Sequence, residues 1–303
     1  MVGIKNKLII TFFILSFAFV PISENSQLVS AQEDTKTEAA DTSQANTSQT
    51  EVAPEALEIL KDMSDTLISA KEFTFDSEIT NGRTLDSGQT IQYSGTMATS
   101  VKRPNNVYAK FVGDSGTREV WYSGTKLTLY NANKQFYGVL KTPDSIDATM
   151  DFLINNYDFT LALADILNAD PYTSFMETTT GGFVVGDSIV RRVECSHLAF
   201  TGQYVDWQIW ISNEDPALPY KFVINYKEIE GEPQYQAIFS NWNLEPKLSK
   251  STFKADIPKD AVKIDFINFK KEKEVENNEE KQHKTTERIN CFFTINSNAH
   301  RHT

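Results

Sequence analysis

The segment that most constrains the fold is a pair of β-branched and aromatic runs separated by a polar loop. The first run is Asp206–Ile211 and the second is Tyr220–Tyr226, while residues 212–219 between them are rich in Ser, Asn, Asp and Pro. This composition is typical of a strand, a loop and a returning strand. We therefore predict a long antiparallel hairpin.

Each predicted strand carries three apolar side chains on one face, because side chains alternate between the faces of a strand. These six candidate ligand-binding residues are Trp207, Ile209, Ile211, Phe222, Ile224 and Tyr226. The opposite faces mix polar and apolar residues. If the two apolar faces coincide, they form a broad surface that a helix or a ligand must cover.

The chain before the hairpin predicts one helix followed by an antiparallel meander. Pro54 suits the first turn of a helix, and apolar residues recur at helical spacing up to Lys71. From Phe73 the pattern changes to short alternating runs between turn formers. The expected turns are Asn81-Gly82, Ser87-Gly88, Arg103–Asn106, Ser123-Gly124 and Asn131–Asn133.

A helical insertion interrupts the predicted sheet. Apolar residues between Asp144 and Glu177 repeat at helical spacing, which predicts two or three helices. We expect this insertion to act as a lid over the hairpin, with Asn155-Asn156 as a mobile connection. Further strands are expected at residues 182–185, 192–200, 235–242 and 262–266.

The N-terminus has the pattern of a secretory signal peptide. Two lysines precede the apolar run Leu8–Val20, which is shorter than the roughly 20 residues that cross a bilayer core. Val29–Ala31 fits the small-residue rule for a cleavage site. We predict that residues 1–31 are removed and that Gln32 begins the mature protein. An uncleaved membrane anchor is the alternative, whereas the lack of a cysteine at the end of the run argues against a lipid anchor.

Two polar segments flank the predicted domain. Residues 32–53 contain almost nothing to bury, so we expect a disordered linker, and residues 268–303 read as a charged, solvated tail. One of the two cysteines, Cys291, lies in that tail, so a disulfide with Cys195 is not expected. The net charge of −12 disfavours binding to nucleic acid or to anionic lipid surfaces.

Catalytic and metal-binding patterns are sparse. His197 is the single histidine outside the tail, which excludes a histidine-rich metal site in the domain. Cys195 lies two residues away, but such residues on one strand are about 7 Å apart, whereas a nucleophile and its base need about 3 Å. We interpret them as a buried cysteine and a packed histidine. No cofactor is predicted.

Gly113–Gly116 resembles the surroundings of a serine-protease nucleophile. The flanking strands instead favour a hairpin turn, and the mechanism also needs a histidine and an aspartate at the serine. A hydrolase that uses Ser115 or Cys195 is retained as the third hypothesis.

Several motifs, spread in order through the chain, resemble a bacterial family known only as a domain of unknown function (2092) among predicted periplasmic proteins. These motifs are Pro54–Ser64, Arg118–Gly124, Asp170–Tyr172, Cys195–Phe200, Val205–Ile211 and Phe239–Leu244. The resemblance covers about Pro54 to Phe266. That family is similar to the lipoprotein-localisation carriers of the LolA/LolB-like superfamily, and it has no agreed catalytic residues.

The resemblance implies an α+β, mainly β fold for residues 54–267. The expected architecture is a strongly curved antiparallel sheet, an open half-barrel, with an N-terminal helix and a helical insertion covering its concave face. Such a fold can hold acyl chains between the sheet and the helices. Fold transfers more safely than function in resemblances of this kind.

Two hypotheses of function from different classes lead. The first is an exported, non-enzymatic binding protein that holds a lipid, a lipoprotein acyl chain or a similar apolar ligand in the concave face. The alternative is an envelope protein-interaction or stress-sensor module whose groove is filled by its own helices. In both, the mature protein is periplasmic or otherwise extracytoplasmic and is not an integral membrane protein.

Overall fold

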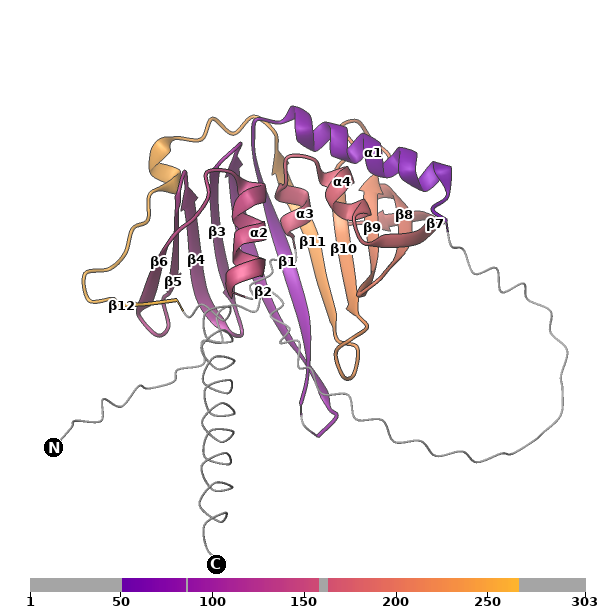
Figure 1. Cartoon of the computed structure of the whole chain (residues 1–303). Coiled ribbons are helices and arrows are strands. Elements are labelled where there is room, and N and C mark those ends of the chain that lie inside the picture. Colours follow the sequence, from indigo (N-terminus) through magenta and orange to yellow (C-terminus); the bar gives the residue numbers. More distant parts are fainter. Residues whose placement is uncertain (1–50, 86, 158–162, 267–303) are drawn as a thin grey trace, which may run out of the picture.

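The computed structural model describes residues 51–85, 87–157 and 163–266. Within them, one curved, open sheet of 12 strands carries short helices in front of one face, and a longer helix crosses one end (Figure 1). The expected mainly β fold with an N-terminal helix and a helical insertion is therefore confirmed. The predicted signal peptide and charged tail, and the linker up to residue 50, lie outside the described residues.

The strands fall into two consecutive groups separated by the helical insertion. The first group is β1 (Glu72–Thr84), β2 (Thr90–Lys102), β3 (Asn106–Gly113), β4 (Gly116–Ser123), β5 (Lys126–Asn131) and β6 (Phe136–Lys141). The second group is β7 (Thr179–Val190), β8 (Val193–Gly202), β9 (Val205–Ser212), β10 (Pro219–Tyr226) and β11 (Gln234–Asn243). A last short strand is β12 (Val262–Ile264).

The two groups join through β1 and β11, so the first and last long strands lie in the middle of the sheet. The order is β12-β6-β5-β4-β3-β2-β1-β11-β10-β9-β8-β7, which leaves β12 and β7 at the edges. Neighbouring strands are antiparallel except β12, which runs parallel to β6. Sequential strands thus form two meanders, and the insertion connects the opposite sides of the open sheet.

Five helical segments accompany the sheet in the described residues. They are α1 (Pro54–Ser69), α2 (Ile146–Tyr157), α3 (Ala164–Leu167), α4 (Pro171–Met176) and the 3-10 turn η1 (Lys250–Phe253). Helix α1 lies along one end of the sheet, and α2, α3 and α4 lie in front of it (Figure 1). The insertion contains three helices, as expected.

The core lies between the sheet and the helices. Helix α1 buries one stripe that includes Leu60, Met63 and Leu67, which are 0% exposed. This stripe belongs to the same hydrophobic cluster as the inward side chains of the strands and of α2, α3 and α4. Burial of these apolar faces is the dominant stabilising term of such a fold.

Two expectations about connections are wrong. Asn81-Gly82 lies inside β1 rather than in a turn, because the pairing of β1 with β2 continues to Thr84 opposite Thr90. Asn155-Asn156 is not a mobile connection, since both residues belong to the last turn of α2 and the Asn156 side chain donates to the Phe152 carbonyl. In each case the partners of the segment override its local turn propensity.

The end of the expected linker is ordered against the sheet. Val52 forms a parallel bridge with Gly182 of β7, and the Ala53 amide donates to the Gly182 carbonyl at 2.9 Å. These contacts set the entry of α1 onto the end of the sheet. Within the described part of the chain, no helix is long and apolar enough to cross a membrane.

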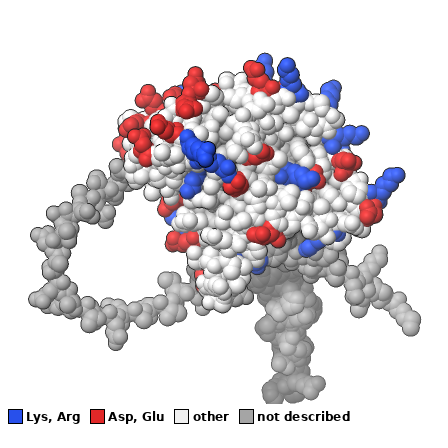
Figure 2. All heavy atoms as spheres, turned by 180° about the vertical axis from the view of Figure 1, so that it is seen from behind, with Lys and Arg blue, Asp and Glu red and all other residues white. Residues whose placement is uncertain are grey.

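Charge is unevenly distributed over the molecule. Figure 2 shows the face behind Figure 1, where acidic side chains gather at the end that carries the start of α1, and basic side chains lie along the opposite side. Most of the sheet surface between them is uncharged in this view.

Candidate ligand-binding groove

The predicted hairpin is formed by β9 and β10, with the apolar faces in register. Trp207 lies opposite Ile224, and Ile209 lies opposite Phe222. Ile211 pairs with Pro219 at the loop end, next to a register shift. The prediction that the two apolar faces coincide is therefore confirmed.

The six predicted residues face the helices. Five of them lie in the core cluster and are at most 7% exposed, and Tyr226 packs against this cluster. Phe175 of α4 covers them, since its ring stacks on Trp207 at 4.9 Å and meets Phe222 edge-on at 5.6 Å. Phe200 of β8 stacks on Trp207 at 4.0 Å. A protein side chain thus occupies the place directly above the hairpin.

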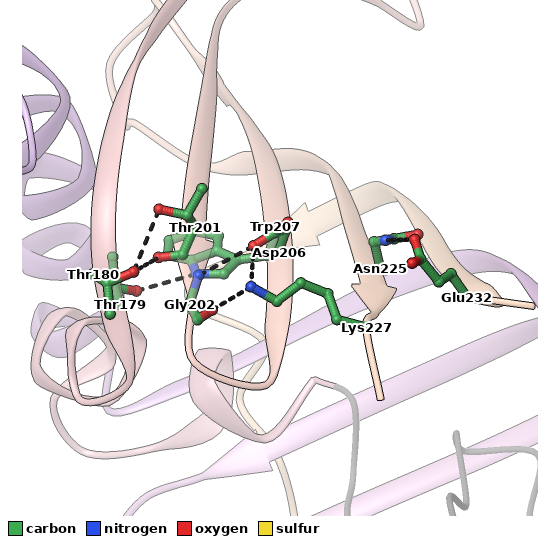
Figure 3. Close-up of polar contacts among 9 residues, drawn as sticks. All are labelled: Thr179, Thr180, Thr201, Gly202, Asp206, Trp207, Asn225, Lys227 and Glu232. Carbon is green, nitrogen blue, oxygen red and sulfur yellow. Dashed lines mark hydrogen bonds and ion pairs between the residues drawn. The ribbon is translucent and has the colours of Figure 1, made fainter. Parts of the chain in front are cut away.

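Polar contacts connect the end of α4 to the hairpin through Thr179, the first residue of β7. The Trp207 indole N–H donates to the Thr179 hydroxyl at 3.2 Å (Figure 3). This hydroxyl donates to the carbonyl of Phe175 in α4 at 2.7 Å. Lys227, which directly follows β10, forms an ion pair with Asp206 of β9 at 2.9 Å and so connects the two strands of the hairpin at this end. The indole is therefore satisfied, which a buried Trp requires.

The start of α4 is pinned to α1. The hydroxyl of Ser64, which is 0% exposed, accepts a hydrogen bond from the Tyr172 amide at 2.9 Å. Asp170 is the N-cap, and its carboxylate accepts from the Thr173 amide and hydroxyl, which lowers the pKa of Asp170. Because both ends are held, α4 is a firm cover for this part of the sheet.

A further contact, which we call the Arg103 latch, connects the helical insertion to the β2–β3 turn. The Arg103 guanidinium donates to the carbonyl of Leu167, the last residue of α3, at 2.7 Å and lies over the Phe73 ring at 5.5 Å. Its Nε and Nη2 atoms are buried and have no partner among the described residues. Burial lowers the pKa of Arg103, against the opposing effect of Asp147. The closed latch is therefore one charge-assisted hydrogen bond from a buried cation.

Two tyrosines place hydroxyl groups in the apolar interior. Burial raises the pKa of both Tyr226 and Tyr235. The Tyr235 hydroxyl is fully buried and makes no hydrogen bond to the described residues. An unpaired buried hydroxyl costs about 1–3 kcal/mol, and a polar atom of a ligand would satisfy it.

The opposite half of the inner face of the sheet is covered differently. There Phe266, which follows β12, packs against Tyr157 at the end of α2 with the rings 5.9 Å apart. Phe266 also fills the space left by Gly138, where a Cβ would lie 2.6 Å from its ring. A cavity of about 30 Å³ lies beside it, between β4, β5, β6 and the segment 264–266.

The outer face of the sheet holds the cysteine and histidine that the sequence singled out. Cys195 is fully buried in a small cluster with Trp210, and burial raises the pKa of its thiol to about 11. His197 stacks on Trp210 at 3.9 Å, and its Nε2 bonds Gln208 at 2.9 Å. A protonated thiol without a base is a poor nucleophile, so the structural interpretation of both residues is favoured.

Ser115 lies in the turn between β3 and β4, as expected. Its hydroxyl accepts from Arg118 at 2.8 Å. Six strands separate β4 from β8, which carries His197. The geometry therefore does not assemble a serine triad from these residues. In the described ranges, no three His, Cys, Asp or Glu side chains gather as a metal site.

An open cleft of about 430 Å³ lies between α1 and the β9–β10 loop. It is lined by the acidic residues Asp62, Asp65, Glu214 and Asp215, and Ile211 forms part of its wall. Carboxylates of this density disfavour anionic ligands in that cleft.

The sequence interpretation missed the two inward arginines and Phe266. The position of Arg118 could have been predicted from the sequence. Alternate residues of a strand lie on the same face, so Arg118 lies on the face of Val120 and Tyr122, which point into the core. A charged residue in an apolar alternation marks an interior cation. Arg103 and Phe266 lacked such a signal, since a turn and a chain end give no periodicity.

Comparisons with solved structures give distant likenesses. An uncharacterized conserved protein from Thermus thermophilus is 11% identical, with 70% of this chain and 99% of that chain covered and a TM-score of 0.42. Lipoprotein LppX from Mycobacterium tuberculosis is 11% identical (68% and 99% covered, TM-score 0.37). A LolA superfamily protein from Nitrosomonas europaea is 13% identical (66% and 98% covered, TM-score 0.33).

No curated protein matches the sequence. Residues 56–267 match the family described as predicted periplasmic protein (DUF2092), which is nearly the span of the expected domain. The resemblance inferred from the motifs is thus confirmed, and the description agrees with the expected location outside the cytoplasm. The chain belongs to this family of predicted periplasmic proteins.

Proposed function

We propose that this protein is an exported, non-enzymatic binding protein that holds a lipid, a lipoprotein acyl chain or a similar apolar ligand between the sheet and the helices. The candidate lining on the hairpin side is the set of six residues of β9 and β10 that face α4. The ligand replaces side chains of the cover when it enters.

The observation that carries this proposal is the nature of the cover. An apolar surface extends across the inner face of the sheet, yet the insertion that covers it is divided into three helices, of which α2 has 12 residues, α3 has 4 and α4 has 6. Helices as short as α3 and α4 are not stable alone, so their position depends on a few tertiary contacts. A cover of this kind can be displaced in pieces.

The energy of such binding needs no catalytic group. Burial of an acyl chain contributes about 0.8 kcal/mol per methylene. A chain of about 16 carbons therefore gains on the order of 10 kcal/mol before the cost of moving the cover is subtracted. That margin exceeds the contribution of one latch such as the bond from Arg103 to Leu167.

The test is a measurement of bound ligand. Protein purified without detergent is extracted and the extract is analysed by mass spectrometry, and delipidated protein is titrated with a fluorescent fatty acid. We expect co-purified lipid or saturable uptake with one site per chain. Clean spectra together with absence of uptake would overturn the proposal.

One observation favours the alternative of a protein-interaction or sensor module with a self-filled groove. Phe175 already stacks on Trp207 and contacts Phe222, as a ligand would. The variant Phe175→Ala separates the two functions, because it vacates this position. A binding protein gains affinity for the probe in this variant, whereas a module with a permanently filled groove only loses stability.

A further inference from the structure

The cavity beside Phe266 has a cation in its wall. Six of the residues around it are Arg118, Leu129, Asn131, Phe136, Gly138 and Phe266. Arg118, Asn131 and Phe136 are register partners across β4, β5 and β6, so they form a row on the inner face of the sheet. The cavity thus combines an apolar wall with one charged and one amide side chain.

Arg118 is held rigidly but is not neutralised. Its Nη1 and Nη2 atoms donate to the hydroxyl and carbonyl of Ser115 at 2.8 and 2.9 Å. Its Nε atom is buried and has no hydrogen-bond partner among the described residues. No carboxylate in the described part of the chain forms an ion pair with it. Burial lowers the pKa of Arg118, the expected sign for a cation that lacks a counter-ion.

The two acidic residues at the cavity are not the missing partners. Glu119 lies on the outer face, where it accepts from Tyr108 at 2.8 Å and pairs with Lys110 at 3.5 Å. Asp265 is exposed and forms no ion pair with Arg118. The donors of Arg118 therefore remain available to an anion that enters from outside.

We propose that Arg118 and this cavity form the head-group end of the groove, and that its ligand is an anionic amphiphile with a carboxylate or phosphate on an acyl chain. This inference rests on the proposed function and names the ligand class and its orientation. The head group bonds Arg118 at the rim, and the chain runs along the inner face under α2. A guanidinium suits this task because it offers several donors in one plane to an oxyanion.

The segment 264–266 occupies this end in the structure. Its Phe266 ring fills the position of the first part of the chain, and its Asp265 carboxylate lines the same cavity. A cavity of about 30 Å³ has room for no more than a few water molecules, so a head group enters only when this segment moves. The segment is therefore an internal occupant that a ligand displaces.

The test compares a charged and a neutral probe of the same shape. Delipidated wild-type protein, Arg118→Gln and the control Lys110→Gln are titrated with cis-parinaric acid and with its alcohol analogue. Both variants remove one positive charge from adjacent strands, but Lys110 is on the outer face and is 44% exposed. Thermal unfolding verifies that each variant is folded, and Arg118→Lys is a second variant that keeps the charge without the Nε donor.

We expect Arg118→Gln to weaken binding of the acid about tenfold and to leave the alcohol within about twofold, because one charge-assisted hydrogen bond is lost. Lys110→Gln should change neither probe. If Arg118→Gln folds and binds the acid as well as the control does, the head-group site is wrong and the binding protein stands. The head-group site is also wrong if wild type binds the acid and the alcohol equally well. If Arg118→Gln does not fold, Arg118→Lys decides the question, and an unchanged affinity of Arg118→Lys for the acid would contradict the head-group site. If neither probe binds wild type, both proposals fall.

Discussion

The two halves of the concave face are made from one sheet but are covered in different ways. In the hairpin half, formed by β8 to β10, α4 is pinned at both ends and Phe175 seals the surface. The other half, formed by β4 to β6, is covered in part by the segment 264–266, and we call it the strap half after this segment. A cavity lies beneath the segment next to Arg118. The comparison indicates that one half is sealed by packing, whereas the other keeps a small cavity beneath its cover.

The largest expected effect is on the hairpin half. Phe222→Ala should lower the free energy of unfolding by about 3–5 kcal/mol, because the Phe222 side chain is 2% exposed and contacts Phe175 and Trp207. Urea unfolding measures this loss. Ile209→Ala, at 0% exposure, should cost about 2–5 kcal/mol.

These two variants also test the assignment of the hairpin residues as ligand contacts. If Phe222→Ala and Ile209→Ala destabilise the protein but leave the probe affinity per folded molecule unchanged, the hairpin half is plain core. The ligand would then be confined to the strap half.

The next effect concerns α3, which lies between the halves. Burial raises the pKa of Asp165 to about 6, above its ordinary value of 3.8. A carboxyl group whose folded pKa is raised stabilises the fold at low pH, and this contribution is lost as the pH rises from about 4 through 6. Asp165→Asn should therefore be more stable than wild type by up to about 2 kcal/mol at pH 7.5, after allowance for its partial exposure.

Urea unfolding of both proteins at pH 3.5 and at pH 7.5 measures that difference, which should vanish at the lower pH. If the two proteins differ in free energy of unfolding by the same amount at both pH values, the charge of Asp165 does not destabilise the fold.

A smaller effect is expected from the latch at α3. Arg103→Met keeps much of the side-chain volume but loses the bond to the Leu167 carbonyl, so the cover should open more often. The Asn168 amide, which bonds the Ala164 carbonyl at 3.0 Å, should exchange with solvent about tenfold faster. Hydrogen exchange by NMR measures this rate. Unchanged exchange at Asn168 would show that α3 is held by packing alone.

The smallest effect on stability is expected in the strap half. Phe266→Ala should lower the free energy of unfolding by about 1 kcal/mol, because the ring is only partly buried. The same variant should take up a fatty acid faster than wild type in stopped-flow mixing, since it enlarges the cavity. A loss as large as that of Phe222→Ala, or slower uptake, would break the contrast between the halves.

Local patterns predicted much of this protein. The alternation in β9 and β10 identified the inward residues from Trp207 to Ile224, because a buried face imposes a period of two. Helical spacing located α1 and the insertion. Turn propensity failed at Asn81-Gly82, where pairing with β2 continues through a sequence that favours a bend.

The sequence by itself determined which side chains turn inward, since burial repeats with the period of each strand or helix. Only the tertiary structure decided what covers them. The pairing of β1 with β11, the stacking of Phe175 on Trp207 and the approach of Phe266 to Gly138 join residues far apart in the chain. Such contacts depend on the shape of the assembled sheet and leave no periodic trace. The seal on one half and the cavity at Arg118 in the other are therefore visible only in the folded protein.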